Sequence, residues 1–326
     1  MFTFKAKHAV LIIAIPFIFQ VLESVNGPWP IPFKWPEVSS DLFEFDTRKR
    51  QFVEPNISTG DHWDMQQSFY HSSICQYARD CVPKSVKFPM KIAVAPSVGL
   101  SVCIVGGTLS AELEALVCYL ERMSAIKDLN KLSVSQIETF CGATNKFHSI
   151  TEMSRNIRVR IRDMNRWAFV MVMKDPIDRF ITGFIKHCIV KGDSCYNCGN
   201  DPVCFADVYH IRLQQFAMYN EENYRSISEI DWDLFPQTWM CDVEQWREKY
   251  RILPYSSNME QVVSNFTEFL GYKHFAAVDR IFRSSRWHEQ WDYGLELDLR
   301  KTIARNWQLR HLIEKMYHND FKILNS

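Results

Sequence analysis

The chain has no excess of charge of either sign. Lysine and arginine together number 38, as do aspartate and glutamate, so the formal net charge is zero. A balanced charge does not indicate a nucleic acid as the main partner. The sequence also has no internal repeat and no low-complexity tract. With 326 residues, 47% of them hydrophobic, it can bury the core of one large α/β domain or two small ones.

The apolar run near the N-terminus is too short for an ordinary membrane span. Lys5 and Lys7 precede the run 9–19, whereas crossing a bilayer takes about 20 apolar residues. A cationic start before a short apolar run is typical of a secretory signal, which we assign to residues 1–27. A cleaved signal peptide and an uncleaved signal anchor both fit, and we prefer the cleaved form. Either form predicts that the rest of the chain enters the secretory pathway.

Glycosylation sequons and cysteines agree with an oxidising compartment. Asn56 and Asn265 each begin an Asn-X-Ser/Thr sequon. Ten cysteines occur, and in a secreted protein they favour disulfides over metal ligands. Cys75 and Cys81 are close enough for a small local loop. The sequence leaves the disulfide pairing open.

No metal site is predicted. Four cysteines in one stretch have spacings that zinc could use, but no matching Cys/His half follows: Cys188, Cys195, Cys198 and Cys204. The ten histidines are scattered, and none forms a helical pair four residues apart. We therefore interpret the cysteine cluster as structural disulfides.

Residues 28–90 are predicted to form a stem and residues 91–326 the core domain. Four prolines between positions 28 and 36 keep the first part extended and poor in helix. The core begins with two apolar strand candidates, Lys91–Ala95 and Val102–Val105, followed by an amphipathic helix over Ala111–Met123. Between strand and helix lies a loop that contains Gly106, Gly107, Thr108 and Ser110. A strand, a glycine-containing loop and a helix form the layout of a phosphate cradle, because backbone N–H groups and the helix dipole point at one spot.

The stretch 167–184, WAFVMVMKDPIDRFITGF, predicts a strand, a tight turn and a helix. The run Ala168–Met173 is short and continuously apolar, as in a strand buried on both faces. Asp175 suits a helix N-cap, and Pro176 suits the first helical position. Apolar residues then recur at helical spacing from Ile177 to Ile189 and mark the buried stripe.

The same stretch gathers groups that bind an anion. Lys174 lies at the carboxyl end of the strand, and Arg179, Thr182 and Lys186 form a second stripe along the helix. Cations and a hydroxyl beside a helix start suit a phosphate. The alternative is an ordinary amphipathic helix with a basic outer face.

KDPIDRFITGF, residues 174–184, resembles the 3′-phosphate-binding motif of the Golgi carbohydrate sulfotransferases, RDPxxRxxSGF, especially in a nematode-type branch. In that family the opening arginine and the serine bind the 3′-phosphate of 3′-phosphoadenosine 5′-phosphosulfate. Lys174 and Thr182 stand at those places here, with Arg179 beside them. Lysine keeps the charge but gives up bidentate geometry. Weaker resemblances lie in the cysteine cluster and in the segments 236–241, 255–257 and 317–324, and the whole covers roughly 85–326.

The resemblance implies a fold, a donor and an acceptor. The fold would be α/β, a parallel sheet flanked by helices in the P-loop-like sulfotransferase arrangement, with ligand at the carboxyl ends of the strands. The donor would be 3′-phosphoadenosine 5′-phosphosulfate, whose 5′-phosphosulfate would lie on the backbone of Gly106–Ser110. The acceptor would be a glycan or proteoglycan in the Golgi lumen, with the protein anchored in the Golgi membrane or, if the signal is cleaved, secreted.

The chain departs from the family at two chemically important places. The family's loop lysine corresponds to Gly107, and no Lys or Arg occurs between Lys91 and Arg122. Glu112 and Glu114, in the first turn of the next helix, would oppose a bound phosphosulfate.

At the second place, the histidine of the family segment HFxPQxWxC corresponds to Asp233. This residue is a candidate base, although a carboxylate at its ordinary pKa is a weak one. The sequence thus predicts a carbohydrate sulfotransferase, or alternatively an inactive relative that binds a glycan or protein partner. A secreted structural protein without a donor site is the weakest alternative. The acceptor sugar and hydroxyl, the activity and the oligomeric state are not predicted.

Overall fold

The computed structural model describes residues 75, 80–83, 90–126, 128–218, 227–284 and 293–325, all within the unit Gln51–Ser326. The predicted signal segment, most of the predicted stem and the sequon at Asn56 lie outside these residues. Within the described ranges, no helix is both long enough and apolar enough to cross a membrane.

The core is a five-stranded sheet in the order β3-β1-β2-β4-β5. Its strands are β1 (Ile92–Ala95), β2 (Leu100–Cys103), β3 (Lys146–Phe147), β4 (Ala168–Met173) and β5 (Tyr250–Pro254). Neighbours β2, β4 and β5 are parallel, whereas β1 runs antiparallel to both β2 and β3. The predicted α/β class is confirmed, and β1 is the exception to the parallel arrangement. Only Pro96–Gly99 joins β1 to β2, too short a connection for a parallel crossover.

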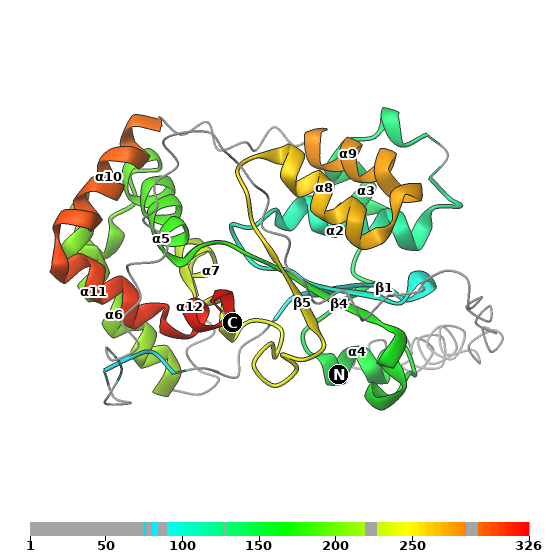
Figure 1. The fold of residues 1–326 in the computed structure, drawn as a ribbon, viewed down its shortest axis with the longest axis horizontal. Helices are drawn as coiled ribbons and strands as arrows, with labels where there is room; N and C mark the ends of the chain where they lie inside the picture. The colour runs from blue at the N-terminus through cyan, green and yellow to red at the C-terminus, as the bar shows by residue number, and fades with distance from the viewer. Residues whose placement is uncertain are drawn as a thin grey trace, which may run out of the picture. The chain divides into compact units, whose positions relative to one another are not determined.

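Helices cover both faces of the sheet (Figure 1). Above it in this view lie α2 (Ser110–Arg122), α3 (Val134–Thr139), α8 (Met259–Leu270) and α9 (Phe275–Ser284), and below it lies α4 (Ile150–Asn156). On the α4 side, the Ser101 hydroxyl of β2 lies 3.6 Å from the sulfur of Met153. The continuous apolar sequence of β4 follows from this double cover, because both of its faces are buried.

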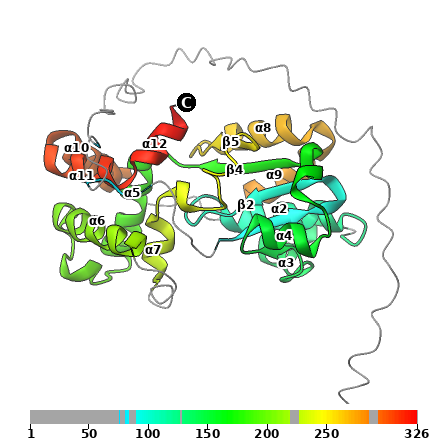
Figure 2. The same cartoon turned by 90° about the horizontal axis from the view of Figure 1, so that it is seen from below.

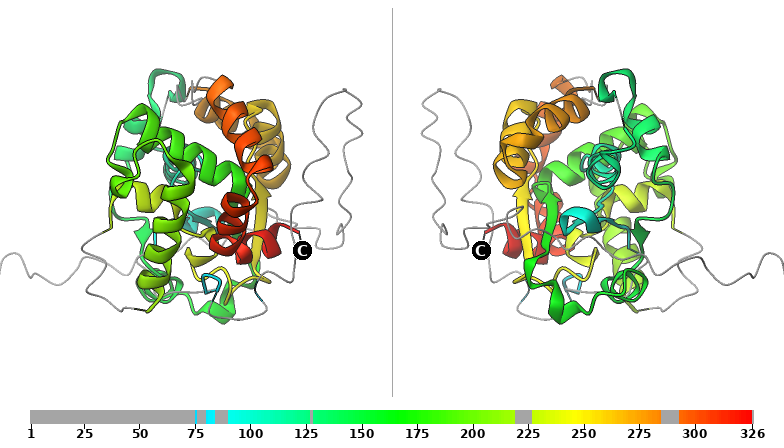
Figure 3. Two further views of the ribbon diagram at one scale, coloured as in Figure 1. Left: turned by 90° about the vertical axis from the view of Figure 1, so that its left-hand side faces the viewer. Right: turned by 90° about the vertical axis from the view of Figure 1, so that its right-hand side faces the viewer.

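A second group of helices lies beside the sheet, next to the end of β4 (Figures 1 and 2). It comprises α5 (Pro176–Phe184), α6 (Pro202–Met218), α7 (Glu229–Leu234), α10 (Tyr293–Arg305), α11 (Trp307–Met316) and α12 (His318–Leu324). Figure 3, left, shows this group from its outer side. The turn from β4 into α5 therefore lies where the sheet meets the second helical group.

Helix α5 forms as its sequence predicts. The Asp175 carboxylate accepts hydrogen bonds from the Ile177 and Asp178 amides, and Pro176 occupies the first turn. Phe180 and Phe184 are buried and pack on Phe205 of α6, with ring centroids 6.0 and 5.4 Å away. Beyond Phe184 the chain continues as a π-helix, Ile185–Val190, which the periodicity did not predict.

All ten cysteines are paired, so the prediction of disulfides is confirmed. The pairs are Cys75–Cys81, Cys103–Cys241, Cys118–Cys141, Cys188–Cys195 and Cys198–Cys204. The second pair joins the end of β2 to the segment after the 3₁₀-helix Gln237–Trp239.

The sequon at Asn265 lies within α8. Asn265 is half-buried and Thr267, its hydroxyl residue, is buried. Glycosylation there stays a prediction, and a glycan would have to be added before α8 packs.

Candidate functional site

Two loops meet at the carboxyl ends of neighbouring parallel strands. One leads from β2 through Gly106 and Gly107 into α2, and the other leads from β4 through Lys174 into α5. Because β2 and β4 are hydrogen-bonded in parallel, both loops leave the same edge of the sheet. The structure therefore brings the two sequence-predicted phosphate sites together.

Lys174 is held rigidly and lies next to Thr182. Its side chain is 1% exposed, and its Nζ donates to the Thr182 hydroxyl at 3.2 Å. The same ammonium lies 4.4 Å from the ring centroid of Tyr255, at the end of β5. The side-chain amide of Gln237 holds both main-chain groups of Lys174: its Oε1 accepts from the Lys174 N–H, and its Nε2 donates to the Lys174 carbonyl oxygen, each at 2.8 Å. A cation and a hydroxyl thus lie side by side just beyond β4, as the sequence predicts for a 3′-phosphate site.

Arg179 points its guanidinium at backbone carbonyls. It is 1% exposed and donates to the carbonyl oxygens of Phe235 (2.9 Å), Gly106 (2.8 Å) and Trp232 (3.2 Å). These bonds tie the β2 loop and the end of α7 to α5. The geometry gives Arg179 a positioning role, and its place among the phosphate ligands stays a prediction.

The glycine pair is required by close packing and by backbone shape. A Cβ on Gly106 would lie 2.6 Å from the Trp232 carbonyl oxygen, far inside van der Waals contact. Gly107 has φ +71°, in the left-handed region that favours glycine. A side chain at Gly107 would have room, since its nearest neighbours are Asp233 oxygens 3.8 Å away.

Thr108 shapes the loop from inside. It is buried, and both its hydroxyl (2.8 Å) and its amide (3.3 Å) donate to the Val105 carbonyl oxygen. Ser110 begins α2 and is half-buried. That Gly106, Gly107, Thr108 and Ser110 bind phosphosulfate stays a prediction, with the Thr108 donors already engaged.

Asp233 lies beside the glycine pair as part of a charge cluster. Its Oδ2 accepts from Lys186 Nζ at 2.5 Å and lies 2.9 Å from His187 Nε2. Burial opposes ionisation, but the hydrogen bonds from His187 and Lys186 outweigh it and lower the pKa of Asp233 to about 2. A carboxylate with so low a pKa is a weak proton acceptor. The geometry makes Asp233 a counter-ion of Lys186, and a role as base stays a prediction from the sequence.

The charge of Glu114 is balanced within the fold. Its buried carboxylate forms ion pairs of 2.5 Å with both Lys91 and Lys146. The expectation that Glu114 repels a bound phosphosulfate is therefore wrong, because two ammonium groups neutralise it locally. Glu112 is buried in the same helix.

Two residues that position the site, Gln237 and Asp320, were not singled out in the sequence, where only the resemblance of their segments was noted. The Asp320 carboxylate of α12 accepts hydrogen bonds from the backbone N–H groups of Gln237 (2.8 Å) and Thr238 (2.9 Å). Gln237 in turn holds both main-chain groups of Lys174. The signals that could have found them were the resemblances at 236–241 and 317–324.

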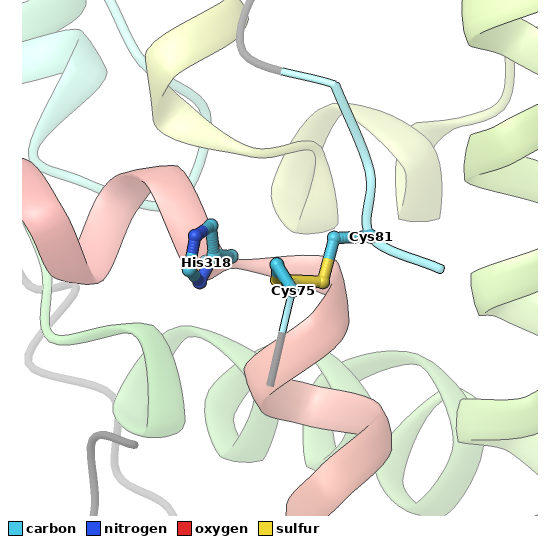
Figure 4. Close-up of side chains that lie close together, drawn as sticks. All are labelled: Cys75, Cys81 and His318. Atoms are coloured by element: carbon cyan, nitrogen blue, oxygen red, sulfur yellow. A yellow bond between two sulfur atoms is a disulfide. The ribbon is translucent and has the colours of Figure 1, made fainter. Parts of the chain in front are cut away.

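Among the residues that the structure describes, two groups of side chains are close enough to suggest a metal. Figure 4 shows Cys75, Cys81 and His318, but the two sulfurs form a disulfide and offer no thiolate. The second group is His187, Glu229 and Asp233. Its carboxylates are paired with ammonium groups: Asp233 with Lys186, and Glu229 with Lys191 at 2.6 Å.

A family model described as "Sulfotransferase family" matches residues 90–325. Three Caenorhabditis elegans proteins are similar to this chain. "Putative sulfotransferase vep-2" is 26% identical over 58% of this chain and 59% of its own length, and "Uncharacterized protein C18B2.2" is 25% identical over 56% and 52%. "Carbohydrate sulfotransferase chst-1" is 21% identical over 76% and 78%. The chain thus spans less than two thirds of the first two relatives. No solved structure matches.

Proposed function

The chain belongs to the sulfotransferase family, and from this premise we propose that it moves a sulfuryl group from 3′-phosphoadenosine 5′-phosphosulfate to a sugar hydroxyl. The observation that carries the proposal is the paired cation and hydroxyl, Lys174 and Thr182, beyond β4. The Arg179 bond to Gly106 fixes this pair relative to the loop beyond β2. A nucleotide with phosphates at both its 3′ and 5′ positions suits two such neighbouring loops.

Each half has a distinct task. Lys174 and Thr182 would bind the 3′-phosphate by a charge-assisted bond and a hydroxyl bond, and so orient the nucleotide. The β2 loop and the start of α2 would face the 5′-phosphosulfate. The reaction resembles in-line phosphoryl transfer, in which positioning and charge stabilisation supply most of the acceleration.

A sugar acceptor and a secretory location complete the proposal. The similarity to a protein named as a carbohydrate sulfotransferase supports a glycan or proteoglycan acceptor. Five disulfides, with the apolar run near the N-terminus, support the secretory pathway, in the Golgi lumen or membrane.

Binding of adenosine 3′,5′-bisphosphate to the full chain tests the donor site. At 100 times its Kd the ligand should stabilise the fold by about 2.7 kcal/mol, seen as a rise in Tm. Lys174→Ala should abolish the rise and Lys174→Arg should keep it. Lys131→Ala is the control, because Lys131 is 82% exposed and pairs with Asp128 at the surface. No rise in the unaltered chain at saturating ligand would refute the proposal.

The alternative function is an inactive relative that binds a glycan or protein partner. It is favoured by one observation, the lack of a cation in the loop Gly106–Ser110. Radiolabelled sulfate transfer to a panel of glycans separates the two. Nucleotide binding with transfer supports the enzyme, and nucleotide binding without transfer to any glycan supports the alternative.

A further inference from the structure

The loop that faces the 5′-phosphosulfate has no cation of its own. Lys91, which precedes it, is paired with Glu114, and Arg122 stands at the far end of the 13-residue helix α2, about 20 Å away. Arg179 also contacts the loop, with Nη1 4.0 Å from a Cβ built on Gly107, but three of its five N–H donors are engaged by backbone carbonyls. A phosphosulfate on this loop needs a positive charge from another segment, because its own charge grows on the leaving oxygen as sulfate departs.

Lys186 and this loop both lie next to the carboxylate of Asp233. Its ammonium lies 2.5 Å from Asp233 Oδ2. The other oxygen of Asp233 lies 3.3 Å from a Cβ built on Gly106 and 3.8 Å from one built on Gly107. The ammonium and the glycine pair therefore stand on two sides of the same side chain.

The position of Lys186 on the helix also places it near Thr182, a residue of the 3′-phosphate half. It follows Thr182 by four residues, so the two occupy one face of the helix. It lies in the π-helical stretch Ile185–Val190, and such stretches occur frequently at functional sites. Its side chain is 29% exposed, so it can move toward a ligand.

We propose that Lys186 supplies the positive charge for the 5′-phosphosulfate that the loop itself lacks, its ammonium turning from Asp233, which stands between it and the glycine pair, toward the bound ligand. This inference rests on the proposed function. As the acceptor oxygen bonds to sulfur, the bond from sulfur to the 5′-phosphate oxygen breaks and its electron pair stays on that oxygen, next to the ammonium. The acceptor's proton leaves to water.

Three adenosine nucleotides separate the two halves of the site in titrations of the full chain. The ratio of Kd for adenosine 3′-monophosphate to that for the 3′,5′-bisphosphate measures the contribution of the 5′-phosphate. The ratio for adenosine 5′-monophosphate to the bisphosphate measures that of the 3′-phosphate. Lys186→Met should reduce the first ratio by about tenfold or more, the usual size of a lost charge-assisted bond. Lys174→Ala should reduce the second.

Lys191→Met is the matched control. Lys191 follows the same π-helical stretch, is 37% exposed and pairs at 2.6 Å with Glu229, which lies 3.5 Å from Lys186 Nζ as well. It should leave both ratios unchanged. Lys186→Arg keeps the charge and should retain most of the 5′-phosphate contribution. An unchanged first ratio in Lys186→Met overturns the inference while leaving the proposed function intact, whereas no bisphosphate binding in the unaltered chain overturns both.

A double variant distinguishes direct action from mere neutralisation of Asp233. In Lys186→Met with Asp233→Asn, the carboxylate beside the glycine pair is gone, and Glu229 keeps its ion pair with Lys191. We expect the first ratio to stay low, because the ammonium itself is missing. Recovery in the double variant would show that Lys186 only screens Asp233. Loss of the 5′-phosphate contribution in EDTA would assign the charge to a metal on His187, Glu229 and Asp233 and would also overturn the inference.

Discussion

Arg179 donates a 2.8 Å hydrogen bond to the carbonyl oxygen of Gly106, 73 residues away in the sequence. This contact joins the helix that follows β4 to the loop that follows β2. A guanidinium can hold several carbonyls at once because its donors form a fixed fork. The two loops are therefore one structural unit, and a change at Arg179 should affect both of them.

Arg179→Met should destabilise the fold and weaken both phosphate contributions together. The change leaves three carbonyls at 106, 232 and 235 without their donor, and each unsatisfied buried group costs about 1–3 kcal/mol. We expect a loss of about 3–5 kcal/mol in the free energy of unfolding, measured by urea denaturation. Arg160→Met, at a surface ion pair, should change it by less than about 1 kcal/mol. A loss confined to one phosphate would contradict the joint role.

Gly106 and Gly107 should respond differently to alanine. At Gly106 the new methyl group would meet backbone, the Trp232 carbonyl oxygen at 2.6 Å, which cannot move without shifting α7. At Gly107 the cost is backbone strain alone, about 1–2 kcal/mol for a left-handed residue. Urea denaturation should therefore show a larger loss for Gly106→Ala. Equal losses would mean that the loop can move away from α7.

A lysine introduced at Gly107 should restore the 5′-phosphate contribution to nucleotide binding that Lys186→Met removes. A Cβ on Gly107 would make only ordinary contacts, with two Asp233 oxygens at 3.8 Å and Arg179 Nη1 at 4.0 Å, and the Asp233 carboxylate would attract the new ammonium. Gly107→Lys with Lys186→Met should recover the 5′-phosphate contribution to binding at a cost of about 1–2 kcal/mol in stability. Gly107→Gln, which brings length without charge, is the control. Equal recovery by glutamine would show that charge is not what the site lacks.

Local sequence signals predicted one half of the site well. The strand, its cap at Asp175 and the neighbouring Lys174 and Thr182 follow from residues that are close in the chain. The other half depends on pairings between distant residues that no local pattern carries. Asp320 bonds to an amide 83 residues away, and Lys186 to a carboxylate 47 residues away. The reversed strand β1 was missed for a different reason, since an apolar strand has the same sequence pattern in either direction.

Asp175→Asn should stabilise the protein at pH 7 and remove part of its pH dependence. Burial and the neighbouring charge of Asp178 raise the pKa of Asp175 to about 6, against about 3.9 in an unfolded chain. Protonation of Asp175 therefore favours the folded state. This contribution to the free energy of unfolding is fully present below about pH 4 and is lost as the pH rises through 6. Asparagine keeps the N-cap acceptor without the charge.

Urea denaturation from pH 4 to 8 measures this effect. We expect the asparagine variant to gain about 1 kcal/mol at pH 7, less than the full shift because Asp175 is partly exposed. Asp175→Ala, which also loses the cap to the Ile177 and Asp178 amides, is the control and should be less stable than the asparagine variant. The same pH slope in all three proteins would argue against a raised pKa at Asp175.

Asp320→Ala should weaken the 3′-phosphate half through Gln237. The buried carboxylate fixes the amides of Gln237 and Thr238, and the Gln237 side chain holds the main chain of Lys174. Loss of two acceptors should lower the free energy of unfolding by about 2–5 kcal/mol. The 3′-phosphate contribution to nucleotide binding should fall, whereas the 5′-phosphate contribution should not. Asp298→Ala, 78% exposed on α10, is the control and should leave stability and binding unchanged. If stability falls while the 3′-phosphate contribution stays intact, Lys174 keeps its position without Gln237. Asp320 then has no effect on phosphate binding through Gln237, and the prediction is wrong.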